Sequence, residues 1–511
     1  MQKTRSIMIQ GTGSHVGKSV LVAALCRIFA QDGYKVAPFK SQNMSNNSFV
    51  TKSGGEMGRA QVMQAEAAMV EPHVDMNPIL LKPTGDKGSQ VVLQGKPLEH
   101  LLARDYYARK ARLWDAVVES YERLAGQYAI LVIEGAGSPA EVNLKENEIV
   151  NMRVALFANA PVLLVGDIDK GGVFAWLVGT LELLTEEERN QVKGLIINKF
   201  RGDVSLLTDG LKFLEDRTGI PVLGVIPYFH DIYLDEEDAV TLERDEIPTS
   251  DEEAKDVLDI AVVRLPRISN FTDFEALAAT EKVKLRYAAQ PGVVGHPDAI
   301  ILPGTKNTLA DLLFLKESGL ADSLLVAKRK GTHIIGICGG FQMLGKEVFD
   351  RFHVESPLER VAGLGLLDII TEMNPEKLTA QVKAKINNPR FDAAETELVG
   401  YEIHQGETEL LAGTTPLFVI VERSGQAVEV SDGAISDDGK VWGTYLHGLF
   451  DNDEFRLAFV NRLREEKGYS PLQETATFHF EREKQQGYDK LAELVREHLD
   501  IPRIYEILGV L

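Results

Sequence analysis

The residue best placed for covalent chemistry is Cys338, in the segment THIIGICGGFQMLG that runs from Thr332 to Gly345. An apolar run, the cysteine and a helical pattern follow one another, and Gly336, Cys338 and Gly340 have the G-x-C-x-G spacing of a nucleophile elbow. Glycines on both sides permit a strained turn, and a helix N-terminus favours the thiolate. The pattern predicts a nucleophilic cysteine; the alternative is a small buried apolar side chain at a strand end.

A nucleophilic thiol needs a proton-transfer partner. The preferred candidate is His447 in GTYLHGLF, which follows another short apolar run, and the alternative is His404 in GYEIHQG. Either histidine taken alone would be interpreted as structural. The N–H groups that stabilise a developing oxyanion are expected from Gly339 and from the segment LPGTKNT, near Gly304.

A second chemical signature lies between Ser6 and Gln31, where a strand pattern, the loop GTGSHVGKS and a helical pattern follow one another. Backbone N–H groups of such a loop, Gly17 among them, hold phosphate oxygens; Lys18 reaches the outer phosphates, and the Ser19 hydroxyl binds Mg²⁺. The spacing is not standard, because Thr12 stands where a P-loop has a glycine. A glycine turn without a ligand is the alternative, but the flanking strand and helix favour an ATP site.

Three more polar residues follow apolar runs and point to the same edge of a sheet, where open α/β sheets bind ligands. Glu134 in IEGAGS is a candidate ligand for Mg²⁺, Asp167 in VGDIDKGG is a second carboxylate, and Asn198 in IINKF is placed to read an adenine edge. Each of them has the simpler alternative of capping the next helix.

The elements that position these residues are short runs rich in Val, Ile and Leu, separated by helix-length segments. Such runs predict parallel sheets covered on both faces, and therefore two doubly wound α/β domains. The stretch from Lys40 to Glu99 is too polar for core and contains one helical pattern, Glu56 to Met69. The apolar runs begin at Ser6, Lys35, Ala129, Val162, Val192 and Val222 in the first half, and at Asp259, Val283, Asp298 and Thr332 in the second.

An acidic segment separates the two series, with eleven acidic residues between Asp235 and Asp256 against Arg244 and Lys255. A charge run of this kind is typical of a solvated connector. We therefore expect a first domain at 1–234, an acidic linker at 235–256, a second domain at 257–454 and a helical tail at 455–511.

Composition limits the functions that remain. A chain of 511 residues is too long for one core, and a net charge of −21 argues against nucleic-acid binding. There is no apolar run of transmembrane length and no signal-peptide pattern, so no membrane association is expected. The two cysteines, of which Cys26 is predicted to be core, cannot form a disulfide framework, and nothing has the spacing of a structural metal site. A cytoplasmic protein is expected.

Taken together, these residues resemble the cobalamin-pathway glutamine amidotransferases, which join a dethiobiotin-synthetase-like ATP domain to a flavodoxin-like class I glutaminase domain. The family's loop resembles GT-x-x-x-VGKS, which accounts for the unusual spacing here. The segments that carry the resemblance lie between Gly11 and Asp451: FKSQNMSNNSFVT, GGEMGRAQ, MNPILLKP, DIDKGGVFA, NKFRGD, LPRISNFTDFEAL, LPGTKNT, GICGGFQMLG, GYEIHQGE and GTYLHGLFD.

The resemblance implies a reaction in two halves. Cys338, with His447, hydrolyses glutamine to release ammonia, while ATP phosphorylates a carboxylate of a corrinoid and ammonia displaces the phosphate. Within the group, QNMSNNS and DIDKGG favour the enzymes that amidate the b, d, e and g carboxylates of adenosylcobyrinic acid a,c-diamide. One alternative is the sister group, which amidates the a and c carboxylates. Another is a regulatory P-loop ATPase with a degenerate glutaminase domain.

Two features of the site are left open by the resemblance. Typical class I glutaminases have a glutamate two residues after the catalytic histidine, but this chain has Leu449 there, so the group that orients His447 is not given. The polar residues Gln42, Asn43, Asn46 and Asn47 are candidates for hydrogen bonds to the corrinoid side chains, although such clusters are also ordinary in loops.

Overall fold

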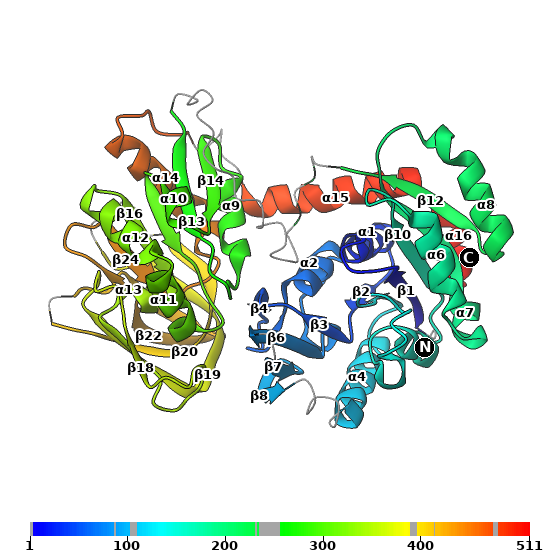
Figure 1. The fold of residues 1–511 in the computed structure, drawn as a ribbon, viewed down its shortest axis with the longest axis horizontal. Helices are drawn as coiled ribbons and strands as arrows, with labels where there is room; N and C mark the ends of the chain where they lie inside the picture. The colour runs from blue at the N-terminus through cyan, green and yellow to red at the C-terminus, as the bar shows by residue number, and fades with distance from the viewer. Residues whose placement is uncertain are drawn as a thin grey trace.

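The computed structural model describes residues 4–85, 88–102, 110–229, 232, 234, 256–388, 396–412, 414–473 and 479–510. The acidic linker lies outside these residues except for Asp256. Figure 1 shows two α/β domains side by side, with both chain termini in the first domain.

The first domain is built on a six-stranded parallel sheet in the order β12-β11-β10-β1-β9-β2. All six predicted runs are strands of this sheet, and apolar cores lie on both faces, as the doubly wound prediction requires. The strands are β1 (Arg5–Gly11), β2 (Val36–Phe39), β9 (Ile130–Glu134), β10 (Val162–Asp167), β11 (Val192–Phe200) and β12 (Val222–Pro227). The helices are α1 (Lys18–Gln31), α4 (Lys110–Ala125), α5 (Met152–Ala158), α6 (Val173–Glu182), α7 (Glu186–Gln191) and α8 (Thr208–Thr218).

The polar stretch after Lys40 is more ordered than the sequence predicts. It contains a small sheet in the order β3-β6-β7-β8 and a separate hairpin of β4 and β5. The predicted helix is present, but its first three residues form β5 instead. The elements are β3 (Gln42–Met44), β4 (Ser48–Val50), β5 (Glu56–Gly58), α2 (Arg59–Ala67), η1 (Val74–Met76), β6 (Ile79–Gly85), β7 (Gly88–Leu93) and β8 (Lys96–Leu102).

The second domain has a central sheet in the order β14-β13-β15-β16-β24-β23, parallel except at β23. The four predicted runs are its strands β13 (Leu258–Val263), β14 (Val283–Ala288), β15 (Ala299–Leu302) and β16 (His333–Ile337), and the sheet is completed by β23 (Ala434–Ile435) and β24 (Val441–Thr444). The helices around it are α9 (Glu275–Ala278), α10 (Pro291–Val294), α11 (Thr308–Glu317), α12 (Leu320–Arg329), α13 (Gly339–Leu344) and α14 (Asp453–Glu466).

A further, mixed sheet packs on this domain and was not expected from the sequence. Its longest strands, β19 and β20, pair antiparallel, and Figure 1 shows them at the side that faces the first domain. The strands are β17 (Glu347–Phe349), β18 (Arg360–Ala362), β19 (Ile369–Ile386), β20 (Glu397–Leu410), β21 (Phe418–Arg423) and β22 (Gln426–Asp432).

The helical tail is divided between the two domains. Helix α14 packs in the core of the second domain, whereas α15 (Phe480–His498) and α16 (Ile501–Leu508) return to the first domain. Tyr488, Leu491 and Val495 of α15 are buried in the same core cluster as α1. Figure 1 shows α15 crossing from one domain to the other, so the second domain is an insertion within the first.

Candidate functional site

The strained turn at Cys338 is present in the structure. Strand β16 ends at Ile337, α13 begins at Gly339, and between them Cys338 has φ 52° and ψ −110°, a positive φ that side chains other than glycine rarely adopt. A Cβ at Gly336 would lie 2.6 Å from the Phe341 nitrogen, and one at Gly340 would lie 2.0 Å from the Leu302 oxygen. The two flanking glycines are therefore required by close backbone contacts.

His447 lies in the same cavity as Cys338 and is oriented by a carboxylate. Its Nδ1 atom is 2.6 Å from Oδ2 of Asp273, and the Gly448 N–H donates to the other oxygen of Asp273 at 3.0 Å. Asp273 is buried in η5 (Phe271–Phe274). Sequence reasoning did not identify this aspartate, because it lies far along the chain from His447; the only signal was its presence in the segment LPRISNFTDFEAL.

The electrostatics of this site favour a charged imidazole. Burial lowers the pKa of His447, but the charge and hydrogen bond of Asp273, together with those of Cys338, outweigh burial and raise the pKa to about 10. An imidazolium that is hydrogen-bonded to a cysteine stabilises the thiolate. The arrangement is therefore suited to nucleophilic attack by sulfur, followed by proton donation to a leaving amine.

The alternative histidine, His404, lines the cavity but has different partners. Its Nδ1 atom is 2.7 Å from the Gly406 carbonyl oxygen, its Nε2 atom is 3.6 Å from Glu402, and its ring stacks on Tyr445 with centroids 3.8 Å apart. None of these contacts connects His404 to Cys338. The geometry favours His447 as the proton-transfer group.

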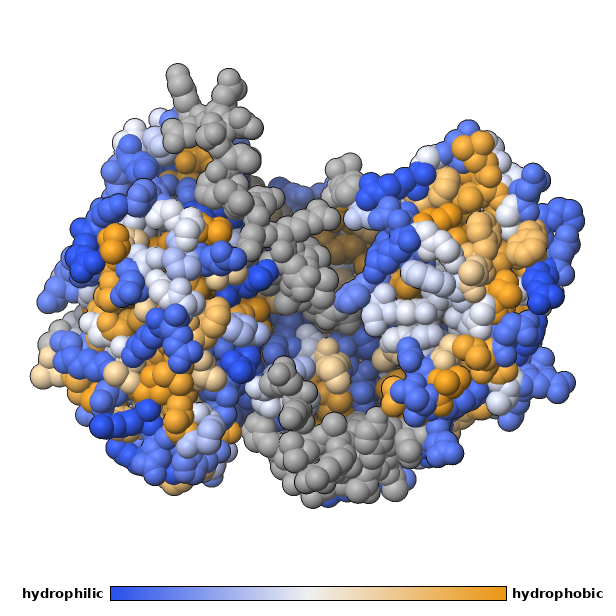
Figure 2. Space-filling model, in the orientation of Figure 1, coloured by the Kyte–Doolittle hydropathy of each residue, from blue (hydrophilic) through white to orange (hydrophobic). Residues whose placement is uncertain are grey.

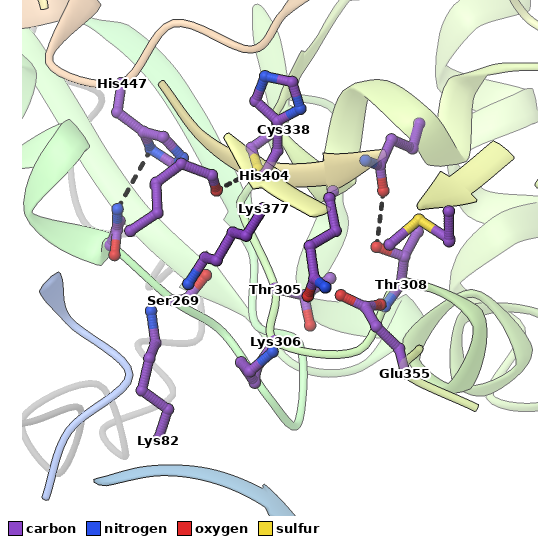
Figure 3. Close-up of a pocket in the computed structure, with 16 residues that line it drawn as sticks. Lys82, Ser269, Thr305, Lys306, Thr308, Cys338, Glu355, Lys377, His404 and His447 are labelled. Atoms are coloured by element: carbon purple, nitrogen blue, oxygen red, sulfur yellow. Dashed lines mark hydrogen bonds between the residues drawn. The ribbon is translucent and has the colours of Figure 1, made fainter. Parts of the chain in front are cut away.

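Charged groups surround the cavity of Cys338, which encloses about 40 Å³ (Figure 3). Lys306, Lys377 and Glu355 come from the second domain, and Lys82 comes from the first. None of these four was singled out from the sequence. The cavity is thus shared between the two domains.

The candidate oxyanion donors lie beside this cavity. A Cβ at Gly339 would be 3.2 Å from the Thr305 nitrogen, so the two backbone segments are in contact at the elbow. Gly304 packs against His447, since a Cβ there would lie 3.3 Å from the Cε1 atom of the ring. Thr305 and Gly339 line the cavity.

The glycine loop of the first domain has the conformation expected of a phosphate site. Gly17 has φ 98° and precedes α1, and the Lys18 ammonium donates to the Gly13 carbonyl at 2.8 Å and to the Gly137 carbonyl at 3.3 Å. The Asn198 side chain donates to the Val16 carbonyl at 2.8 Å, so it supports the loop. Cys26 is fully buried in α1, as predicted.

The predicted Mg²⁺ ligands Ser19 and Glu134 are brought together. The Ser19 hydroxyl donates to Glu134 at 2.9 Å, and Glu134 also accepts from Lys40 at 2.8 Å and from Gln64 at 2.5 Å. A hydroxyl and a carboxylate oxygen side by side fit Mg²⁺, which prefers oxygen ligands. Asp167 is buried and is held by Lys199 at 3.0 Å.

A cavity of about 490 Å³ opens beside the glycine loop, lined by Thr12 to Ser14, Lys170 and Trp176 among others. Next to it the surface is apolar, and Figure 2 shows apolar side chains gathered over α6 and α8. The exposed large apolar residues there are Trp176, Leu183, Val204, Leu206 and Phe213.

The four polar residues predicted to contact a corrinoid lie in or near β3. Asn47 accepts a hydrogen bond from Thr272 of the second domain at 3.1 Å, so it belongs to the domain interface, and Gln42 is half-buried in β3. Within the described part of the chain, Asn43 Nδ2 and Asn46 Oδ1 are buried atoms without a hydrogen-bond partner.

A phosphate-binding loop in one domain and a strained cysteine with a charged histidine in the other define a glutamine-dependent amidotransferase, and the comparisons agree. Residues 7–242 match the CobQ/CobB/MinD/ParA nucleotide binding domain, and residues 259–455 match the CobB/CobQ-like glutamine amidotransferase domain. The cobyric acid synthase of Desulforamulus reducens is 52% identical over 100% of this chain and 99% of its own length. Those of Syntrophobacter fumaroxidans and Yersinia enterocolitica are 49% and 52% identical over 99% and 98% of this chain, and over 99% and 98% of their own lengths. The chain belongs to the cobyric acid synthase family.

Within the described residues, no helix is both long and apolar enough to cross a membrane.

Proposed function

We propose that this enzyme uses ammonia from glutamine and the energy of ATP to amidate the b, d, e and g carboxylates of adenosylcobyrinic acid a,c-diamide. The observation that carries the proposal is the presence of two separate, complete sets of groups in one chain. Cys338, His447 and Asp273 form a hydrolytic site, and Lys18, Ser19 and Glu134 form a phosphoryl-transfer site. We propose a cytoplasmic location for the enzyme.

In the glutaminase site, the Cys338 thiolate attacks the side-chain amide of glutamine. Backbone N–H groups of Gly339 and of the Gly304–Thr305 segment stabilise the oxyanion. His447 gives its proton to the leaving nitrogen, ammonia departs, and water hydrolyses the glutamyl thioester with His447 as the base. Asp273 keeps the imidazole in the tautomer and orientation that these steps need.

In the synthetase site, ATP phosphorylates a carboxylate of the substrate. Lys18 and the loop N–H groups bind the phosphates, Asn198 supports the loop from behind and is a candidate for the adenine edge, and Ser19 and Glu134 would hold Mg²⁺, with Asp167 nearby as a second carboxylate. The metal would neutralise charge on the transferred phosphoryl group. Ammonia then attacks the acyl phosphate, and phosphate leaves.

The corrinoid is proposed to lie between the glycine loop and the polar residues of β3. A corrin ring has a broad apolar face, which the exposed side chains of Trp176, Leu183 and their neighbours would cover, and amide-bearing side chains, which Gln42, Asn43 and Asn46 would bind. We assign the nucleotide and corrinoid functions to 1–234 together with α15 and α16, and the glutaminase function to 257–466.

The test is to incubate the enzyme with ATP, Mg²⁺, glutamine and adenosylcobyrinic acid a,c-diamide and to follow the product masses. Stepwise conversion of four carboxylic acids to amides is expected, with one glutamate and one ADP released for each. Cobyrinic acid serves as the matched control, because amidation of its a and c carboxylates would assign the enzyme to the sister group instead. ATP hydrolysis without any amide product would favour a regulatory ATPase.

A further inference from the structure

The hairpin of β4 and β5 extends from the nucleotide-binding domain to the back of the glutaminase site. Val50 of the hairpin is fully buried in a small apolar cluster with Tyr401 and Ile403 of β20. Two polar contacts to β19 flank this cluster: Gln381 donates to the Val50 carbonyl at 3.0 Å, and Thr379 donates to the Gly54 carbonyl at 2.7 Å. The hairpin is therefore a docked part of the glutaminase domain, although it belongs to the other domain in sequence.

One strand of the hairpin contacts the residues around His447. The Ser48 N–H donates to Asn270 at 3.1 Å, and the Asn270 amide lies 3.5 Å from Nδ1 of His447. Tyr401 stacks on the His447 ring, with centroids 5.2 Å apart, and its hydroxyl donates to the Ser48 carbonyl at 3.2 Å. Ser48 thus holds two of the residues that pack against the histidine.

The other strand holds two lysines of the cavity wall. Glu56 is completely buried, and its two oxygens accept from Lys82 at 2.6 Å and from Lys377 at 2.6 Å. Burial raises the pKa of Glu56, but the ammonium groups of Lys377 and Lys82 outweigh it and hold the pKa well below its usual range. The carboxylate is therefore charged, and it binds one lysine from each domain in the wall of the Cys338 cavity; Lys82 also donates to the Ser48 hydroxyl at 2.8 Å. Figure 3 shows Lys82 and Lys377 directed toward one another at this wall.

We propose that the β4–β5 hairpin completes the glutaminase site, and that Glu56 is a positioning residue for glutamine hydrolysis that the nucleotide-binding domain supplies. The inference rests on the proposed function and adds to it. Helix α2 follows β5 directly, and its Gln64 donates to Glu134 beside Ser19. One short segment, Glu56–Ala67, therefore contacts both active sites.

The test is Glu56→Gln, which keeps the shape of the side chain and removes its charge. Loss of one partner of a buried charge pair predicts a fall of at least about 30-fold in kcat/KM for glutamine. Synthesis driven by added ammonia should stay within about threefold of the parental rate, because the groups that activate the carboxylate are untouched. Glu71→Gln is the matched control. It breaks the ion pair between Glu71 and Lys52, whose side chains are 54% and 70% exposed respectively, and it should change neither rate.

A double-mutant cycle with Lys377→Met separates positioning from a general structural effect. If Glu56 acts by holding Lys377, then Lys377→Met should show the same difference between nitrogen sources, and the double variant should be little worse than either single one. Lys377→Met also decides the matter if Glu56→Gln does not fold. Unchanged glutamine kinetics in the folded variants, or equal loss with glutamine and with ammonia, would overturn the proposal. Failure of the parental enzyme to amidate with either nitrogen source would instead contradict the proposed function.

Discussion

The two active sites of this chain differ in how completely their polar groups are satisfied. In the glutaminase cavity Cys338 is hydrogen-bonded to His447 and His447 to Asp273, and the free space is about 40 Å³. Beside the nucleotide loop the cavity measures about 490 Å³, and Thr12 Oγ1 in its wall is buried without a hydrogen-bond partner in the described structure. Elsewhere in the first domain, Gln10, Asn43, Gln61 and Gln64 each bury one such atom. Among the residues that line the glutaminase cavity, His404 Nε2 is a buried atom without a hydrogen-bond partner in the described structure.

The proposed function explains this difference by what each site has to bind. A site for one small, invariant substrate gains rate from pre-organised groups, because no reorganisation is needed during the reaction. A site for a large substrate must present groups that find their partners only in the complex, since a buried unpaired atom is costly otherwise. On the proposed function, the corrinoid also changes with each amidation, so its site has to accept several related ligands.

The largest expected effect comes from removing the nucleophile. Cys338→Ala should lower glutamine-driven synthesis by about 10⁵-fold or more, because the covalent pathway is lost, and leave ammonia-driven synthesis largely intact. Glutamate release and amide formation are measured with each nitrogen source.

His447→Ala should be nearly as severe, and the Cys338→Ala/His447→Ala double variant little worse than either. A large loss in His404→Ala with near-parental activity in His447→Ala would reverse the assignment of the base.

A change in the nucleotide site is expected to affect synthesis with glutamine and with ammonia alike. Lys18→Ala should reduce synthesis with both nitrogen sources by about 10³-fold or more, because phosphoryl transfer depends on positioning and charge neutralisation. Glutamine hydrolysis measured without the corrinoid serves as the control for folding. Parental synthesis with ammonia in this variant would place the ATP site elsewhere.

A smaller effect, with a defined pH dependence, is expected from Asp273→Asn. Asp273 raises the pKa of His447, so the imidazolium persists as the pH rises until about 10. Without that charge the pKa falls, and the imidazolium is lost at lower pH. Glutamine hydrolysis should drop about 10- to 100-fold near neutral pH, and the alkaline limb of its pH–rate profile should move to lower pH. A profile whose alkaline limb does not move would show that Asp273 does not set the charge of His447.

The smallest effect on catalysis and a clear effect on stability are expected in α15. Leu491→Ala removes a fully buried side chain and should lower the free energy of unfolding of the nucleotide-binding domain by about 2–5 kcal/mol. Hydrogen exchange of α1 amides should become faster, while exchange in α13 should not change. Glu493→Ala, at an exposed position of the same helix, is the control. Faster exchange in the glutaminase domain alone would contradict the packing of α15 on α1.

The strands that could be predicted are those whose apolar runs are continuous, because parallel strands are buried on both faces. All ten such runs lie in the two central sheets, and the resemblance to cobalamin-pathway amidotransferases is confirmed by the relatives. Strands β19 and β20 were not predicted, because one of their faces is half-exposed and buried apolar residues alternate with polar ones along them. The hairpin of β4 and β5 was not predicted because three-residue strands have no periodicity to detect.

The local parts of the site could be predicted, and the long-range ones could not. The turn at Cys338 could be predicted because a glycine-flanked motif follows directly on a strand. Ser19 and Glu134 could be placed near one another because each follows the end of a strand in the same parallel sheet. Asp273 contacts His447, which lies 174 residues away in the sequence, and Glu56 contacts Lys377, which lies 321 residues away. Sequence spacing carries no signal for such pairs, which only the packing of the domains brings together.

The division of the tail between the domains has a consequence for how the chain is made. The nucleotide-binding domain emerges first from the ribosome, but the apolar surface of α1 that α15 and α16 cover stays open until those two helices have been synthesised. Domains emerging from the ribosome fold as units once their sequence is complete, so this domain matures after the glutaminase domain that follows it in the sequence. A chain that ended before α15 would leave that surface of α1 permanently exposed.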